Sequence, residues 1–516
     1  MLRRTARRLP HKQALLFKER TWTYAELDAD CNRIAHGLAA IGVRKGEHVA
    51  ILSRNSAAFV LLRFALARLG AVLVPINFML NPSEVAFVLR HAGVRVLCAA
   101  PDLAETASLA AAQETPVEQL VCLEDGAEQA ARPGWIPFES LYAETISEPA
   151  VDLDSRDPAQ IMYTSGTESL PKGAMLSHDA LLWQYAAVLV EAELTRSDVI
   201  LHALPLYHCA QLDVLLGPGM YAGTTNIVVD QPRPDLVLPA IQQHQVTLFF
   251  APPTVWISLL RSPVFDQVDL SSLRKVIYGA SIMPMEVLRE LNERLPNVRF
   301  WNLYGQTEIA PLATALQPGD AMRKPGSVGT PTLNVETRVV DAEMRDVAPG
   351  EVGEIVHRSP QLLNGYYRDE ERTAEAFVGG WFHSGDLAVV DEEGYITVVD
   401  RKKDMIKTGA ENVATRQVED VLYMLPTVAE AAVIGLPHPR WVEAVTAVVV
   451  PRAGQTVSED AIVAHCRQHL AGFKVPKAVV LVESLPKNPS GKILKRALRT
   501  GLAELYTSGT ANPGAG

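Results

Sequence analysis

The chain has 516 residues, 48% of them hydrophobic and 21% charged, a balance typical of globular proteins. This length accommodates roughly two to four domains, and the net charge of −11 disfavours a general nucleic-acid binder. The five cysteines are odd in number and never form a CxxC pair, which excludes a disulfide scaffold or a cysteine-based zinc module and favours a reducing cytoplasm.

The N-terminus, MLRRTARRLPHK, is basic and lacks the apolar core of a secretory signal. We expect an exposed first helix with at most peripheral membrane contact; a weak membrane-surface or targeting segment is the alternative. Arg63 and Arg68 interrupt Val60–Leu80, the most apolar stretch, so no segment offers the about 20 apolar residues that cross a bilayer.

Residues 20–150 alternate helical and strand patterns, and residues 195–310 repeat this alternation. In the first part, helices are expected at Tyr24–Ile41, Ala57–Leu69 and Pro82–His91, and apolar strands at 48–53, 71–77 and 94–100. The same rhythm returns with strands at 199–205, 225–230, 246–253 and 275–280. Continuous apolar strands that alternate with helices predict parallel α/β sheets covered by helices on both faces.

From about Gly326 the pattern changes to short strands between turns, at 336–341, 353–359, 387–391 and 395–400, which indicates a small antiparallel β unit. After Asp400, helices at Thr415–Leu425, Glu459–Leu470 and Lys492–Leu502 alternate with strands at 431–437, 446–451 and 477–484. We therefore expect a large unit at 1–400, a compact second unit at 401–506 and a disordered polar tail at 507–516.

A loop of small, hydroxyl and glycine residues, Tyr163–Gly173 (YTSGTESLPKG), follows a short apolar run. Such a loop offers backbone N–H groups and hydroxyls to an anion, and Lys172 adds a full positive charge. The spacing is not that of a Walker A loop. The segment nevertheless indicates a phosphate site.

Three later segments carry further polar side chains. In Tyr304–Glu308 (YGQTE), a ring, a hydroxyl and a carboxylate can stack a base, bond a phosphate and hold Mg²⁺, although a turn with a surface acid is the alternative. Asp386 follows a turn and can take two ribose hydroxyls, and the charged run Arg401–Lys403 begins the second unit. Lys492 lies in a loop framed by proline and glycine (NPSGK), where a merely exposed lysine is the alternative.

Together and in this order, TSGT…PKG, YGQTE, WFHSGD…GY…DRKKD and NPSGK resemble the adenylate-forming superfamily, which includes acyl-CoA synthetases, peptide-synthetase adenylation domains and firefly-type luciferases. The resemblance extends from about Ala14 to Arg499. It implies an α/β fold with a large N-terminal domain of two α/β subdomains plus a small β-barrel-like subdomain, and a small mobile C-terminal α+β domain.

The resemblance also implies roles for individual residues. For ATP it implies the phosphate loop Thr164, Ser165, Gly166, Thr167 and Lys172, the adenine and acyl neighbours Gly279, Ala280, Ser281, Tyr304 and Gly305, and the ribose contacts Asp386 and Arg401. It also implies the hinge Lys403 and, beside the path of the CoA pantetheine, the small-domain hairpin Thr408 and Gly409. For catalysis it implies Lys492 in the adenylation step, Thr307 on phosphate, Glu308 as the Mg²⁺ ligand, and His208 as the gate or neighbour of the substrate carboxylate.

The activity implied is an ATP-dependent acid–CoA ligase that uses ATP, Mg²⁺ and coenzyme A. We expect free CoA as the thiol, no nucleic-acid partner, and a monomer or homodimer. A medium- or long-chain fatty acid is the first expectation for the acid, and an aromatic acid of the cinnamate, ferulate or benzoate type is the alternative. The segment Leu206–Asp213 lacks the early Asp of amino-acid-activating relatives, which disfavours an amino acid.

Two departures from the family pattern bear on activity. Glu168-Ser169 stands where Thr-Gly is usual, so the loop expected to bind the triphosphate contains a carboxylate. In the small-domain hairpin, Gly409-Ala410 replaces a Gly-Gly pair. A weakly active or non-catalytic nucleotide-binding relative is therefore a second alternative. Lys492, Glu308 and Asp386 argue against it.

Overall fold

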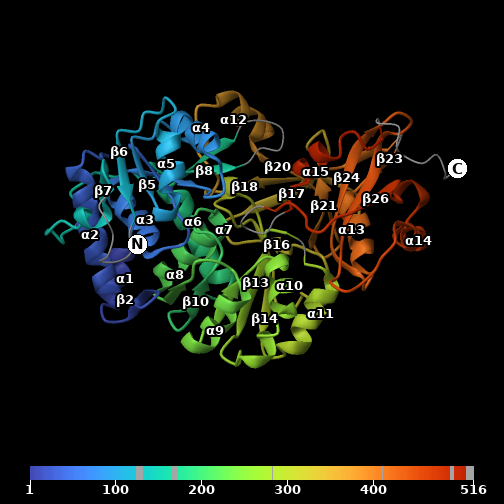
Figure 1. The fold of residues 1–516 in the computed structure, drawn as a ribbon, viewed down its shortest axis with the longest axis horizontal. Helices are drawn as coiled ribbons and strands as arrows, with labels where there is room; N and C mark the ends of the chain where they lie inside the picture. The colour runs from blue at the N-terminus through green and yellow to red at the C-terminus, as the bar shows by residue number, and fades with distance from the viewer. Residues whose placement is uncertain (124–131, 165–170, 282, 409–410, 488–492, 507–516) are drawn as a thin grey trace.

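The computed structural model describes residues 1–123, 132–164, 171–281, 283–408, 411–487 and 493–506. Figure 1 shows two neighbouring α/β lobes, blue and green, with the C-terminal elements in orange and red at the right. The structure confirms the expected α/β fold with a large N-terminal and a small C-terminal domain. No described helix combines the length and the apolar character needed to cross a membrane.

The first lobe is built on an eight-stranded sheet. In spatial order its strands are β19 (Gly365–Tyr366), β9 (Lys172–Ser177), β8 (Pro158–Thr164), β4 (Val72–Ile76), β3 (His48–Leu52), β5 (Val96–Ala99), β6 (Gln119–Cys122) and β7 (Trp135–Pro137). Its helices are α2 (Tyr24–Ala40), α3 (Ala57–Leu69), α4 (Pro82–Ala92) and α5 (Ala104–Ala111). Helix α4 begins at a capping box of Asn81 and Glu84 and ends at Gly93, which adopts a positive φ of 68°.

The second lobe is built on a nine-stranded sheet. In spatial order its strands are β16 (Thr330–Pro331), β15 (Thr314–Leu316), β14 (Arg299–Tyr304), β13 (Lys275–Gly279), β12 (Leu248–Phe250), β10 (Val199–His202), β11 (Thr225–Val228), β1 (Gln13–Phe17) and β2 (Arg20–Thr23). Its helices are α6 (His178–Glu191), α8 (Gly217–Ala222), α9 (Pro234–His244), α10 (Pro253–Arg261) and α11 (Met285–Arg294).

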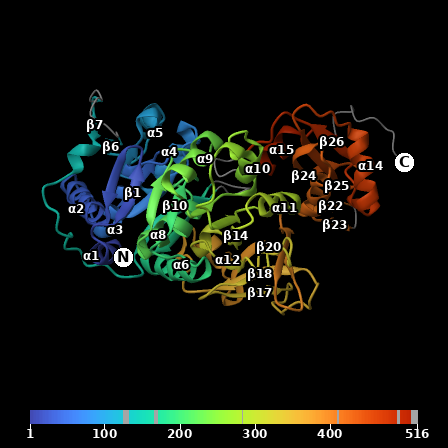
Figure 2. The same ribbon diagram turned by 90° about the horizontal axis from the view of Figure 1, so that it is seen from below.

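Two smaller sheets follow (Figure 2). The four-stranded antiparallel sheet consists of β17 (Glu336–Val340), β18 (Gly353–Arg358), β20 (Phe382–Val390) and β21 (Ile396–Arg401), and α12 (Glu370–Ala376) lies between β18 and β20 in the chain. The small domain has β22 (Ile406–Thr408), β23 (Glu411–Val413), β24 (Val428–His438), β25 (Val442–Pro451) and β26 (Ala478–Leu481), with α13 (Thr415–Tyr423), α14 (Glu459–His469) and α15 (Lys495–Gly501).

The parallel strands expected from the apolar runs form the centres of both large sheets, but antiparallel pairs complete their edges. Strand β9 returns beside β8 as a hairpin, and β15 and β16 extend the second sheet antiparallel to β14. The N-terminal hairpin β1–β2 joins the second lobe, because β1 pairs in parallel with β11. Helix α1 (Leu2–Arg8) exposes its arginines and buries Leu2, Thr5 and Ala6.

Candidate functional site

Three sheets contribute polar side chains to one region. Lys172 begins β9 of the first sheet, Tyr304 ends β14 of the second, and Asp386 lies in β20 of the four-stranded sheet. The Tyr304 hydroxyl donates a 2.6 Å hydrogen bond to Asp386, and Lys172 Nζ lies 3.8 Å from Glu308 Oε1. Residues far apart in the sequence therefore meet where the sheets adjoin.

One end of this region pairs a lysine with a buried carboxylate through a phenol. Lys172 Nζ donates to the Tyr366 hydroxyl over 2.9 Å, and that hydroxyl donates to Glu308 Oε1 over 2.9 Å. Glu308 is only 7% exposed. Burial, and then the negative charge of Glu308, raise the pKa of Tyr366, so the phenol stays protonated and can donate.

The turn that carries Glu308 is shaped by glycine. A Cβ atom at Gly305 would lie 1.9 Å from the carbonyl oxygen of Pro311, so no other residue fits there without moving the backbone. A 3₁₀ turn, Thr307–Ile309, follows directly. The glycine in YGQTE thus lets the chain fold back closely enough to direct Thr307 and Glu308 toward the neighbouring sheet.

The other end pairs a buried aspartate with a tyrosine and an arginine. Asp386 and Arg401 are directly opposite each other in the β20–β21 ladder, and Arg401 Nε lies 3.0 Å from Asp386 Oδ1. Tyr304 donates to the second oxygen, Oδ2. Burial and the Asp386 charge raise the pKa of Tyr304 well above its ordinary value, so this phenol also stays protonated.

The segment Leu206–Asp213, expected beside the substrate acid, borders the phosphate end of the site. His208 caps the short helix α7 (Cys209–Gln211), since its Nδ1 accepts from the Ala210 N–H over 3.1 Å. That bond leaves the ring proton of neutral His208 on Nε2. The Cys209 thiol lies 3.3 Å from the Thr307 hydroxyl, and burial raises the pKa of this thiol to about 12.

Three buried polar atoms of the site have no hydrogen-bond partner among the described residues: Thr164 Oγ1, Gln306 Nε2 and Asp386 Oδ1. Arg401 supplies charge to Asp386 Oδ1 but not the geometry of a hydrogen bond. Buried polar groups are usually paired, so such atoms in one region indicate a ligand site. A hydroxyl and an amide N–H suit phosphate oxygens, and a carboxylate oxygen suits ribose hydroxyls.

Comparison with known proteins agrees with this geometry. Residues 2–367 match the AMP-binding enzyme family, and residues 417–492 match the AMP-binding enzyme C-terminal domain. The chain is 40% identical to a feruloyl-CoA synthase of Amycolatopsis over 96% of its length and 97% of the relative. It is 36% identical to a long-chain-fatty-acid–CoA ligase of Mycobacterium tuberculosis, with 97% of each chain covered.

Among solved structures, an anthranilate CoA ligase in complex with anthranoyl-AMP superposes with a TM-score of 0.90 at 28% identity, over 98% of this chain and 96% of that chain. The chain belongs to the AMP-binding enzyme family. Within that family it is one of the acyl-CoA synthetases and ligases, since its matches span nearly the whole of both chains.

As a member of this family, the chain brings most of the expected residues to one place. The contacts above connect Thr164, Lys172, His208, Tyr304, Gly305, Thr307, Glu308, Asp386 and Arg401. Gly279 pairs with Leu303 in the β13–β14 ladder, which places Gly279, Ala280 and Ser281 beside Tyr304. Their roles remain predictions.

Other expected residues are placed elsewhere or lie outside the described residues. Thr408 ends β22 inside the small-domain sheet, and Lys403 lies in the turn after β21. The residues outside the described ranges are Ser165, Gly166, Thr167, Glu168, Ser169, Gly409, Ala410, Lys492 and the tail 507–516.

Sequence reasoning missed three residues that the structure places in the site: Tyr366, Gln306 and Cys209. Tyr366 follows Gly365 in a short GYY run, which is the only local signal, and nothing in that run indicates contact with residues 172 and 308. Gln306 lies inside YGQTE, and Cys209 directly follows His208, so both were one position from residues that the motifs singled out.

The described residues also fit magnesium. In the described part of the chain, no group of three or more His, Cys, Asp or Glu side chains is arranged so that it could hold a metal ion. Mg²⁺ bound to a nucleotide commonly uses only one or two protein carboxylates, together with phosphate oxygens and water. Glu308 beside Lys172 provides a single carboxylate of this kind.

Proposed function

We propose that the protein activates an aromatic acid of the cinnamate or ferulate type as its CoA thioester. The observation that carries this proposal is the 40% identity to a feruloyl-CoA synthase over 96% of the chain. The fatty-acid ligase relative is 36% identical, so the comparisons favour the aromatic alternative over the fatty acid expected first from the sequence.

We expect Tyr278, Leu303 and Ile309 to line part of the acyl pocket, and their packing supports a compact substrate. Tyr278, Leu303 and Ile309 are 0–6% exposed and belong to the packed cores of the large domain. Close-packed interiors resist added volume. Binding a short planar ring therefore requires less rearrangement of these side chains than binding a long alkyl chain.

In the first half-reaction, a carboxylate oxygen attacks the α-phosphorus of ATP, a P–O bond forms, and the bond to pyrophosphate breaks. Two negative charges about 4 Å apart repel by about 4 kcal/mol at an effective dielectric of 20. Lys172 and the predicted catalytic Lys492 supply positive charge against this repulsion. Magnesium held by Glu308 would neutralise part of the charge on the phosphates.

The nucleoside end holds the rest of ATP in place. We expect Asp386 to accept hydrogen bonds from the ribose hydroxyls, and its contacts with Arg401 and Tyr304 would fix its orientation. His208, whose proton is on Nε2, can donate to the acid carboxylate and direct it toward the phosphorus. In the second half-reaction the CoA sulfur attacks the acyl carbon, a C–S bond forms, and AMP leaves.

A panel of acids tests the proposal. AMP release that depends on both CoA and acid would be measured with ferulate, cinnamate, benzoate, octanoate and palmitate, and kcat/KM compared. We expect the aryl-propenoates to exceed the alkyl acids at least about tenfold, the equivalent of about 1.4 kcal/mol in transition-state binding.

Two outcomes contradict the proposal in different ways. Preference for octanoate or palmitate would overturn the substrate and leave the ligase reaction standing. Absence of AMP with every acid, from protein that is folded, would support a non-catalytic nucleotide-binding relative instead.

A further inference from the structure

A strap of five residues, 363–367, lies between strand β9 and the turn that carries Glu308. On one side, the strap bonds β9: Asn364 N–H donates to the Met175 carbonyl and Tyr367 N–H to the Gly173 carbonyl, each over 2.8 Å. On the other side, the Leu363 N–H donates to the Glu308 carbonyl over 2.8 Å. The strap therefore ties the strand that begins with Lys172 to the backbone of Glu308.

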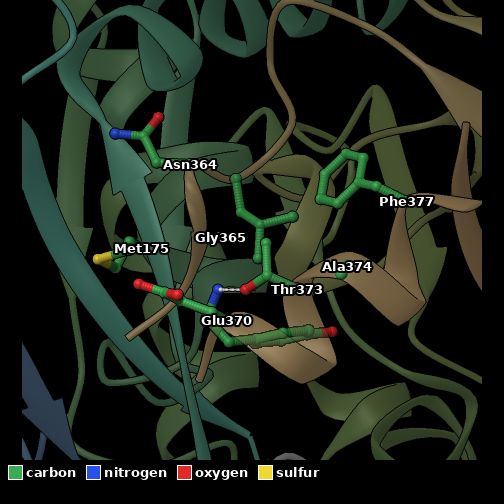
Figure 3. Close-up of a pocket in the computed structure, with 9 residues that line it drawn as sticks. Met175, Asn364, Gly365, Glu370, Thr373, Ala374 and Phe377 are labelled. Carbon is green, nitrogen blue, oxygen red and sulfur yellow. Dashed lines mark hydrogen bonds between the residues drawn. The ribbon is translucent and has the colours of Figure 1, made fainter. Parts of the chain in front are cut away.

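Hydrogen bonds also hold the strap on its outer side. A cavity of about 570 Å³ lies between it and α12. Figure 3 shows Met175 on one side of this cavity and Thr373, Ala374 and Phe377 on the other. The Tyr366 N–H donates to Thr373 Oγ1 over 2.9 Å, and Thr373 in turn donates to the Asp369 carbonyl.

The Tyr366 side chain extends from the strap to the two charged groups. Its hydroxyl lies between Lys172 and Glu308, 2.9 Å from each, and Lys172 Nζ lies 4.3 Å from the centre of its ring. The ring itself is buried, 5% exposed. The phenol thus serves as acceptor for the cation and as donor for the carboxylate at once.

The distance between the two charges shows the effect of this arrangement. Other partly buried lysine–carboxylate pairs in this chain close directly, at 2.9 Å for Lys275–Asp198 and 2.8 Å for Lys495–Glu419. Lys172 and Glu308 remain 3.8 Å apart, with the hydroxyl between them. A direct ion pair would occupy both groups and oppose their use by an incoming nucleotide and metal.

We propose that Tyr366 is a positioning residue of the nucleotide site: its hydroxyl orients Glu308 for magnesium and keeps Lys172 from closing directly onto that carboxylate. This inference rests on the proposed function, because it needs a triphosphate and Mg²⁺ in the site. Tyr366 touches neither reacting group; it acts through Glu308 and Lys172.

Calorimetric titration of the full-length protein tests this without turnover, since no acid is present. The dissociation constant of ATP would be measured with Mg²⁺ and with EDTA, for the wild type, Tyr366→Phe and Tyr367→Phe. Tyr367 is a matched control, because its ring packs on His48 and His91 instead. Phenylalanine keeps the ring and removes only the hydroxyl.

We expect Tyr366→Phe to weaken ATP binding about tenfold with Mg²⁺ and less than about threefold with EDTA, the range of a lost charge-assisted hydrogen bond. Tyr367→Phe should match the wild type in both buffers. In a Glu308→Gln background, Tyr366→Phe should add little, because the two residues act as a unit.

Equal losses with and without Mg²⁺ would show a merely structural role and overturn the inference. An ATP affinity that does not change in Tyr366→Phe would also overturn it. So would affinity losses of Tyr366→Phe and Glu308→Gln that add fully in the double variant. A wild type that binds no ATP at all would instead contradict the proposed function, so the two failures are distinguishable.

Discussion

Asp386 and Glu308 each have a tyrosine and a cation as neighbours, but different parts of the fold hold these neighbours in place. Asp386 has Tyr304 at 2.6 Å and Arg401 at 3.0 Å, and Arg401 faces it across one β ladder. Glu308 has Tyr366 at 2.9 Å and Lys172 at 3.8 Å, each from a different element. The first group is held by the register of a hairpin, and the second is assembled by tertiary contacts.

Under the proposed function, this difference matches what each end has to do. A ribose would be bound without changing its charge, so a fixed acceptor is sufficient. A triphosphate and its metal would bring several charges, part of which then leave with pyrophosphate, so the phosphate end needs groups that can exchange partners. Lys172, whose side chain is 31% exposed, can exchange partners in this way.

The nucleoside end and the phosphate end are proposed to bind ATP. The charge that stabilises the reacting phosphorus is predicted to come mainly from Lys492. Lys492→Ala should therefore give the largest effect, a loss of about 100- to 1,000-fold in adenylation. Thioester formation from a supplied acyl-adenylate should persist. Rapid-quench measurement of each half-reaction checks this, and equal loss in both halves would refute the assigned role.

AMP affinity distinguishes the nucleoside end from the phosphate end, because AMP lacks the β- and γ-phosphates. Asp386→Asn should weaken AMP binding roughly 10- to 100-fold, since Tyr304 and Arg401 lose a buried charged partner. Glu308→Gln should leave AMP binding within about threefold of wild type and reduce the Mg²⁺-dependent binding of ATP. Calorimetry on both variants measures this, and similar losses for AMP would remove the distinction between the ends.

Glu168 tests whether the phosphate end tolerates an extra negative charge. Glu168→Thr should lower the KM for ATP by roughly fivefold, the equivalent of about 1 kcal/mol for two charges near 4 Å in water. Steady-state kinetics with varied ATP provide the measurement. A KM that does not change would mean that this carboxylate does not meet the triphosphate.

A separate effect, on stability and away from the site, comes from a buried hydrogen-bond network around His202. His202 is bonded to Asn226 and Gln211, and burial lowers the pKa of His202 from 6.5 to about 4. The unfolded chain thus takes up a proton at higher pH than the folded chain does. The contribution of His202 is fully present above pH 6.5 and is lost as the pH falls toward 4.

At pH 4 this loss reaches about 3 kcal/mol, at about 1.4 kcal/mol per pKa unit. His202→Gln keeps a donor and an acceptor without a titrating group, so its stability should fall less between pH 6.5 and 4. Urea unfolding at several pH values compares the two proteins. Parallel pH profiles would show that His202 titrates normally.

The sequence was sufficient for the elements that have a local cause. Ala57–Leu69 is a helix over the expected residues, because Ser56 caps its start and Gly70 ends it with a positive φ. The order of motifs was enough to place Lys172, Tyr304, Glu308 and Asp386 in one site. Each of these predictions relied on a pattern within a few residues or on a spacing that the whole family shares.

What escaped prediction depends on pairing between distant segments. Strand β19 has two residues and exists because it pairs with β9, so its own sequence has no strand periodicity to detect. Tyr366 reaches Glu308 only through that pairing. The hydrogen bond that fixes the tautomer of His208 also depends on the turn at Ala210 and not on residue type alone.

The pairing of β1 with β11 has a consequence for how the chain is made. Leu15 lies opposite Asn226, so this strand meets a partner that is synthesised roughly 210 residues later. At the rates of translation this is a wait of about 10 s or more. Throughout that interval Leu15, Leu16 and Phe17 can pair only with β2, and the side of β1 that later pairs with β11 has no strand partner. The sheet of the second lobe thus joins segments far apart in the sequence, so its formation depends on closing a long stretch of chain.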